Sequence, residues 1–320
     1  MDVQGIPQLD AFLPFVYPWF MVLLFLLAGI SARYSLSKRT DRVFAGDRAK
    51  RILVPGIAGI FILGWIAGVI TMHYAPVLGE NPEAVPLVIK YIIACLIGIG
   101  PLWFAHELFI ICMFLLLLRA LDKGGWLWKL GGRTSLIVML LLFFPMWGAS
   151  QIGNLPYVTV YRFGIYPLAF LLGYYVFSHK GVTEKLKRLW LPFGVAALAL
   201  GVWYTVVNYG QNYAEPSLLK NWFTNLYVWI AVLALLACGQ RFLDFENRFT
   251  RYMTKNNFSF YVLHYPVIVG TGFLAVEYAS LPFIFNYIIV LTAAVVLVPL
   301  LIEVIKRIPV LRFLLLGIVR

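Results

Sequence analysis

Charged residues are scarce in this chain of 320 residues, because Asp, Glu, Lys and Arg together make up only 12% of it. An ordinary soluble domain carries about 25% charged residues, so the composition excludes a soluble globular protein. Hydrophobic residues make up 62% of the chain and aromatic residues 17%. A chain with this much apolar surface to bury is not disordered either. A membrane protein with several spans remains.

Cysteine and histidine are also rare, with three and four residues respectively. Cys95, Cys112 and Cys238 lie in apolar stretches at unrelated spacings, without a Cys-x-x-Cys pair or a histidine at metal-ligand spacing. We interpret them as small buried apolar residues. The sequence also lacks a glycine-rich phosphate loop. It therefore predicts no metal site and no permanently bound cofactor.

Nine mostly apolar stretches are each long enough, at about 20 residues, to cross a bilayer as a helix. We expect an all-α, polytopic transmembrane helical bundle that forms a single membrane-embedded domain over residues 1–320. A further apolar stretch, 86–98, is predicted to be an interfacial helix on the outer face, since a tenth crossing there would reverse every later loop. The nine spans run approximately over 12–32, 52–75, 99–118, 135–153, 157–177, 190–208, 218–238, 257–276 and 283–303.

The net charge of +12 comes from 26 Lys and Arg against 14 Asp and Glu. In a membrane protein such an excess indicates loop orientation before it indicates a nucleic-acid partner, because basic loops stay on the cytoplasmic side. Five segments that alternate with basic-poor loops hold 23 of the 26 basic residues, and they are 33–51, 119–133, 179–189, 239–256 and 303–320. The alternation predicts an outer N-terminus, a cytoplasmic C-terminus and nine crossings.

Three ionisable residues are predicted inside the outer half of the bilayer, where charge is costly and therefore a candidate for function. His106 and Glu107 lie about 10–12 Å below the outer face by the helical rise, and Arg162 lies about 8 Å below it. These similar depths predict a Glu107–Arg162 pair. The pair either only neutralises two buried charges or forms one wall of a substrate cavity in which His106 acts as general base or acid.

His264 and an arginine pair near the predicted cytoplasmic face are the other candidates. His264 is predicted about 10 Å inside that face, either as a hydrogen-bonded packing residue or as a functional group. Arg48 and Arg51 immediately precede the second span, with an i, i+3 spacing that places both on one face of an α-helix. They are either anchors for phospholipid headgroups or a site for an anionic ligand, since arginine forks suit phosphate oxygens.

Five stretches occur in a familiar order, namely YPWFMVLLFLLAGISARYSL, GDRAKRILVPG, GIGPLWFAHELFI, RFGIYPLAFLLGYYVF and FSFYVLHYPVIV. From about residue 12 to its end, the chain resembles the acyltransferase-3 family of integral membrane acyltransferases. The resemblance implies a protein, typically with ten spans, that moves acyl groups such as acetyl or succinyl from a cytoplasmic donor, usually acyl-CoA, to carbohydrates or other acceptors. The family's Arg-x-x-Arg motif matches Arg48 and Arg51, which favours a donor-phosphate role for this pair.

The resemblance also implies a first span that carries a basic residue and, about eleven positions later, a histidine regarded as essential for acyl transfer. Nothing in residues 1–11 matches that motif, and nine expected spans are one fewer than ten. Two interpretations follow. Either the gene model starts too late, or the protein is a divergent member that is inactive or uses His106 or His264 instead.

The function expected from the resemblance is a multi-pass acyltransferase of the plasma or inner membrane. Acyl-CoA would be the co-substrate, bound near Arg48 and Arg51, and a hydroxyl of a carbohydrate or another small molecule would be the acceptor. Arg162 would bind the acceptor, with His106, Glu107 or His264 as catalytic residues. The alternative is a non-catalytic pseudoenzyme or a permease-like, solute-binding protein, in which the same polar residues line a pathway.

The predicted orientation is tested with reporter fusions along the chain. Fusions after residues 45, 125 and 183 should all report the cytoplasm, because basic loops flank each site, and a fusion near residue 212 should report the outer side. A reversed signal at any of these positions would contradict the map.

Overall fold

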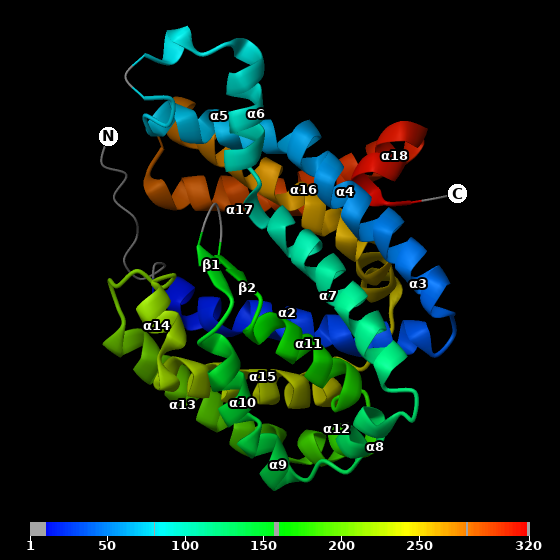
Figure 1. The fold of residues 1–320 in the computed structure, drawn as a ribbon. Coiled ribbons are helices and arrows are strands. Elements are labelled where there is room, and N and C mark those ends of the chain that lie inside the picture. Colours follow the sequence, from blue (N-terminus) through cyan, green and yellow to red (C-terminus); the bar gives the residue numbers. More distant parts are fainter. Residues whose placement is uncertain (1–10, 80, 157–159, 280, 319–320) are drawn as a thin grey trace. The chain divides into compact units, whose positions relative to one another are not determined.

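A computed structural model describes residues 11–79, 81–156, 160–279 and 281–318 (Figure 1). Most of these residues are helical, which confirms the all-α prediction. Within the described ranges, the β structure is a short antiparallel hairpin of β1 (Asn154–Pro156) and β2 (Val160–Arg162). Its register places Asn154 opposite Arg162.

Seven helices in the described part of the chain are long and apolar enough to cross a membrane. The helices α8 (Trp126–Gly132), α9 (Leu136–Leu141) and α10 (Phe143–Ser150) add an eighth crossing if they form one broken span, whose two parts meet at 112°. The structure therefore gives seven or eight spans where the sequence predicted nine. The seven are Phe12–Leu36, Asp41–Tyr74, Gly100–Leu121, Trp190–Val207, Trp222–Phe242, Arg248–Tyr278 and Ile284–Arg307.

The predicted span over residues 157–177 is wrong. Helix α11 covers only Ile165–Tyr175, and 11 residues extend over about half of a hydrocarbon core of about 30 Å. The hairpin replaces the first turns of the predicted span, since Val160 and Tyr161 are residue types that favour strands. Arg162 therefore lies in a strand, and the depth of about 8 Å that assumed a helix does not apply to it.

The stretch that was predicted not to cross forms α6 (Leu87–Ile97), a helix of 11 residues. This length is too short for a transmembrane span. A short helix in place of a tenth crossing is thus confirmed, whereas its position at the outer surface stays a prediction.

Contacts divide the chain into two compact units, each made of two separate segments. Unit 1 contains Met1–Phe44 and Ile111–Glu246, and unit 2 contains Ala45–Ile110 and Asn247–Arg320. The single domain expected over residues 1–320 stays a prediction.

In unit 1, α2 (Phe12–Leu36) packs against α11, α13 (Trp190–Val207) and α15 (Trp222–Phe242). Helix α15 supplies much of the core, including the fully buried Trp229. Helices α2 and α11 touch through glycines. A methyl group built on Gly29 would lie 1.9 Å from the carbonyl oxygen of Phe170, and one built on Gly173 would lie 2.0 Å from that of Leu26. The unit also contains α12 (Lys180–Arg188) and α14 (Pro216–Lys220).

Unit 2 contains most of a long helix that changes type along its length. Its parts are α3 (Asp41–Arg48), η1 (Ala49–Leu53), α4 (Val54–Gly59), η2 (Ile60–Gly64) and α5 (Trp65–Tyr74), where η1 and η2 are π-helical turns. The other helices of the unit are η3 (Pro82–Ala84), α6, η4 (Gly100–Leu102), the first part of α7 (Trp103–Leu121), α16 (Arg248–Tyr278), α17 (Phe283–Arg307) and α18 (Pro309–Leu316).

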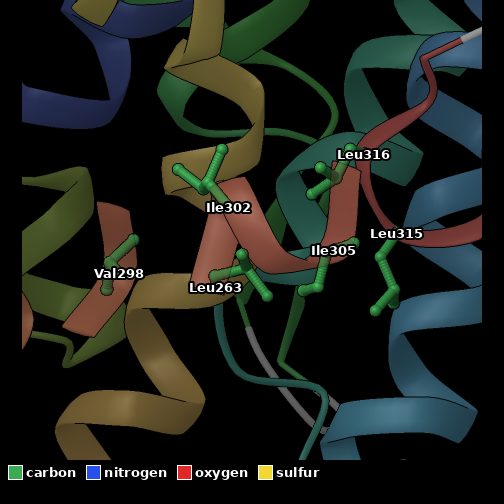
Figure 2. Packing of buried hydrophobic residues seen from close by; sticks show 6 residues of the cluster. All are labelled: Leu263, Val298, Ile302, Ile305, Leu315 and Leu316. Atoms are coloured by element: carbon green, nitrogen blue, oxygen red, sulfur yellow. The ribbon is translucent and has the colours of Figure 1, made fainter. Parts of the chain in front are cut away.

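A buried aliphatic cluster holds the last three helices of unit 2 together (Figure 2). Helix α16 contributes Leu263, α17 contributes Val298, Ile302 and Ile305, and α18 contributes Leu315 and Leu316. Because α18 also packs on α4, this cluster attaches the end of the chain to the long helix.

The small-xxx-small pair Gly64 and Gly68 lies where the long helix meets α6. A methyl group on Gly68 would lie 1.9 Å from the carbonyl oxygen of Ala94, and one on Gly64 would lie 3.0 Å from that of Cys95. Small residues allow helix backbones to approach closely in membranes. These glycines therefore set the position of α6.

Gly68→Ala should lower the thermal midpoint of the detergent-solubilised protein, because the added methyl group has no space against the Ala94 backbone. Overpacking of this kind costs about 1–3 kcal/mol. The control is Gly46→Ala in α3, where a Cβ would meet nothing within 4 Å. An equal midpoint for the two variants would refute the close contact.

Candidate functional site

The arginine pair lies where the long helix changes from an α-helix to a π-helical turn. Arg48 ends α3 and is half-buried, and Arg51 lies exposed within η1. In this turn the backbone N–H of Val54 bonds to the carbonyl of Ala49, five residues back. The wider turn changes the angle between residues three apart, so the stacking predicted from α-helical geometry does not describe this segment. Short π-helical turns frequently mark functional sites.

The C-terminal segment packs directly on the backbone of Arg51. Gly317 ends α18 in the left-handed region, with φ +63°, and a methyl group on it would lie 2.7 Å from the Cα of Arg51. A glycine is needed here both for its backbone conformation and for this contact. The π-helical turn of Arg51 is therefore supported by the end of the chain.

His106 lies in α7 and packs against the same long helix at Gly56, which is five residues beyond Arg51. A methyl group on Gly56 would lie 3.1 Å from Nε2 of His106 and 3.2 Å from Cβ of Ala105. The Nε2 atom is buried and forms no hydrogen bond of ordinary geometry with a described residue. Since a helix rises about 1.5 Å per residue, the imidazole lies about 7–8 Å along the helix from Arg51.

Tyr261 of α16 attaches that helix to the start of α7. Its hydroxyl donates a hydrogen bond to the carbonyl of Pro101 and accepts one from the backbone N–H of Ala105, at 3.3 Å. Ala105 directly precedes His106 in α7. The Tyr261 hydroxyl therefore helps to position the turn that carries the histidine.

His264 follows Tyr261 by almost one helical turn. Its Nδ1 lies 2.7 Å from the carbonyl oxygen of Tyr261 and 3.1 Å from that of Phe260. Because a carbonyl oxygen only accepts, Nδ1 is assigned the proton, and Nε2 of the neutral ring is left as the proton-accepting atom. The His264 ring is thus held by hydrogen bonds that leave Nε2 as a base atom. Its catalytic role stays a prediction.

The helices that carry these residues meet at the next glycine along the long helix. A methyl group on Gly59 would lie 3.0 Å from Cδ1 of Leu102 in η4 and 3.8 Å from Cγ1 of Val262 in α16. Unit 2 thus brings together the helices of three candidates, namely the arginine pair, His106 and His264. Glu107 belongs to the same unit and is completely buried.

Arg162 belongs to unit 1, where it is buried and connects the hairpin to α14. Its Nε donates to Oδ1 of Asn154 and its Nη2 to the carbonyl of Leu219, both at 3.2 Å, and its guanidinium lies 5.7 Å from the ring centroid of Tyr166. The pairing of Arg162 with Glu107 stays a prediction.

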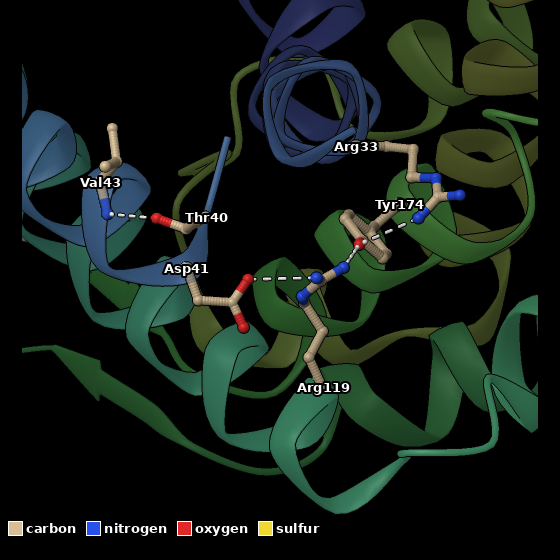
Figure 3. Close-up of polar contacts among 6 residues, drawn as sticks. All are labelled: Arg33, Thr40, Asp41, Val43, Arg119 and Tyr174. Carbon is tan, nitrogen blue, oxygen red and sulfur yellow. Dashed lines mark hydrogen bonds and ion pairs between the residues drawn. The ribbon is translucent and has the colours of Figure 1, made fainter. Parts of the chain in front are cut away.

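Unit 1 contains a polar cluster that no motif in the sequence indicates (Figure 3). The buried hydroxyl of Tyr174 accepts hydrogen bonds from Nη1 of Arg119 and, at 3.4 Å, from Nη1 of Arg33. Nη2 of Arg119 pairs with Asp41 at 3.1 Å. The distribution of basic residues predicts only a role in loop orientation for Arg33 and Arg119. No spacing in the sequence connects positions 33, 119 and 174, so only the fold reveals the cluster.

Among the described residues, no group of three or more His, Cys, Asp or Glu side chains is placed to hold a metal ion. The candidates whose helices meet in unit 2 carry guanidinium and imidazole groups. These side chains recognise anions and move protons.

Comparison with known proteins gives one family and one curated relative. The acyltransferase domain family matches residues 2–304 of the chain. The probable arabinosyltransferase A of Mycobacterium leprae (strain TN) is 28% identical over 183 residues, which cover 54% of this chain and 16% of that protein. The chain thus spans a small part of the length of that relative. No solved structure matches the chain.

Tyr261→Phe should destabilise the protein, because it leaves the Pro101 carbonyl and the Ala105 N–H without this hydroxyl. Hydrogen bonds between membrane helices contribute about 0.6 kcal/mol on average and up to about 1.7 kcal/mol. We expect a lower thermal midpoint in detergent. Tyr278→Phe, at the exposed end of the same helix, is the control, and equal midpoints would show that the Tyr261 hydroxyl does not support α7.

Proposed function

Because the chain belongs to the acyltransferase-3 family of multi-pass membrane proteins, we propose that it transfers an acyl group from acyl-CoA to a hydroxyl of a carbohydrate or another small acceptor. Membership of this family implies a transferase activity. The observation that carries the proposal is the packing of His106 onto the helix that bears Arg48 and Arg51. The protein would act in the plasma or inner membrane, with the donor entering from the cytoplasmic side.

In the proposed complex, Arg48 and Arg51 bind the phosphates of the donor. Guanidinium groups pair with phosphate oxygens through two parallel N–H bonds, which give strength and fix orientation. The positive-inside distribution of charge predicts that this pair lies on the side where acyl-CoA is available. The π-helical turn and the Gly317 contact support the proposal, because they hold the backbone of Arg51 in a defined position.

The proposed reaction needs a base for the acceptor hydroxyl. An imidazole nitrogen removes the hydroxyl proton while the oxygen attacks the thioester carbonyl, the C–S bond breaks, and the thiolate of CoA leaves and takes up a proton. His106 is the first candidate for this base, since it lies beside the arginine helix. His264 is the second, because its hydrogen bonds leave Nε2 as the basic atom.

Glu107 and Arg162 are proposed for the acceptor side. Glu107 is the buried neighbour of His106 in sequence, and a carboxylate accepts hydrogen bonds from sugar hydroxyls. Arg162 uses two of its N–H groups within unit 1, and its remaining donors suit a hydroxyl-bearing acceptor.

The proposal is tested with purified protein in lipid nanodiscs, in which the hydrolysis and transfer of radiolabelled acetyl-CoA are followed. Arg48→Ala and Arg51→Ala should each raise KM for acetyl-CoA about tenfold or more, since a hydrogen bond to a charged group contributes about 1.5–3 kcal/mol. The matched control is Lys50→Ala, which removes a charge from the same π-helical turn.

The same assay distinguishes residues that bind the donor from the residue that acts as the base. His106→Gln should lower kcat by about 10²–10⁴-fold, the usual contribution of a general base, and leave KM for acetyl-CoA nearly unchanged. His264→Gln tests the second candidate, and His73→Gln, at an exposed position, is the control. Wild-type protein that binds acetyl-CoA without turnover would favour the pseudoenzyme, and protein that does not bind it would refute the donor site.

A further inference from the structure

Unit 1 contains a polar cavity of about 230 Å³ beside the Tyr174 cluster. Arg33, Arg119 and Lys123 line it, together with the indole of Trp128. The guanidinium of Arg33 lies 3.6 Å from the centroid of that ring, and His179 also stacks on the ring, at 3.6 Å. The aromatic contact uses the flat face of the Arg33 guanidinium and holds it at the cavity. Since Nη1 donates to the Tyr174 hydroxyl, the other N–H groups are the ones left to bind a ligand.

The charges around the cavity do not balance. Asp41 pairs with Arg119, and the two carboxylate oxygens of Asp122 accept hydrogen bonds from the backbone N–H groups of Trp126 and Leu127, at 2.8 and 3.1 Å. Among the described residues, neither Arg33 nor Lys123 forms an ion pair with a carboxylate. The cavity therefore carries an excess of positive charge and suits an anion.

An apolar groove of about 650 Å³ adjoins this cavity. It lies along α7, the broken helix of α8 and α9, and α11, with side chains such as Phe114, Leu130, Val138 and Leu171 in its walls. Tyr175 lines both the groove and the cavity. A hydrocarbon chain and an anionic group that belong to one molecule therefore have adjacent places in unit 1.

We propose that the groove and the cavity together bind one anionic glycerophospholipid of the membrane, with its phosphate between Arg33 and Lys123 and an acyl chain along the groove. The cavity is smaller than the roughly 300–1,000 Å³ of ordinary small-molecule pockets, so it suits a headgroup rather than a whole nucleotide. A lipid that only surrounds the protein would need no charged pocket at the end of the groove. None of the residues that line the groove and the cavity is among those proposed for acyl transfer.

The headgroup contact is tested by native mass spectrometry of detergent-purified protein mixed with equal amounts of phosphatidylglycerol and phosphatidylcholine. The wild type should retain phosphatidylglycerol in preference. Lys123→Gln, at an exposed position, and Arg33→Gln should each lower that retention roughly fivefold, as expected for one basic residue near an anionic lipid. Arg241→Gln, an exposed basic residue of the same unit, should change nothing.

The groove is tested with two neighbouring substitutions. Val138→Trp fills the groove and should reduce retention of phosphatidylglycerol, whereas Ile137→Trp, at an exposed position outside the groove lining, should not. Equal retention of the two lipids, or an equal effect of Lys123→Gln and Arg241→Gln, would overturn the proposal. Displacement of the lipid by inorganic phosphate at a similar concentration would also overturn it, by showing a site for soluble anions.

Discussion

Close contact between helix backbones at glycines is the constraint on which the rest of unit 2 depends. Lipid provides no hydrophobic force that drives helices together, so packing between them requires small residues at the contacts. Along the long helix, Gly56 makes room for His106, Gly59 for Leu102, and Gly64 and Gly68 for the backbone around α6. A side chain at any of these positions would displace a residue of a neighbouring helix in unit 2.

This constraint also accounts for the environment of the candidate base. The imidazole of His106 packs against a bare stretch of backbone, where no side chain separates it from the helix that carries Arg48 and Arg51. A donor whose phosphates bind the arginines would extend along that helix toward the histidine. The distance of about 7–8 Å along the axis is short compared with an acyl donor, so one bound molecule would reach both groups.

The sequence predicted the features that depend on composition and local pattern. Long apolar runs predicted the helices that are long enough to cross a membrane. The span at 157–177 was wrong because hydropathy does not distinguish a short strand pair from the first turns of a helix. The hairpin at Arg162 depends instead on strand-favouring residues and on the left-handed turn at Gly153, with φ +68°.

Features that depend on contacts between distant segments lay beyond sequence reasoning. Tyr174 has no unusual neighbours in sequence, yet its hydroxyl meets Arg33 and Arg119 from two other helices. The cavity beside it and the groove along the broken helix arise from that packing. Counting basic residues per loop predicted the same side of the membrane for Arg33 and Lys123, but it did not show that they line one cavity.

The central claim is that the acyl donor binds along the long helix of unit 2, beside His106. Photolabelling with an acyl-CoA that carries a diazirine on its acyl chain, followed by peptide mapping, tests it most directly. The account predicts labels within residues 45–74 or 100–110, and their loss when unlabelled acetyl-CoA is added in excess. Labels confined to unit 1, or labels that acetyl-CoA does not compete away, would contradict it.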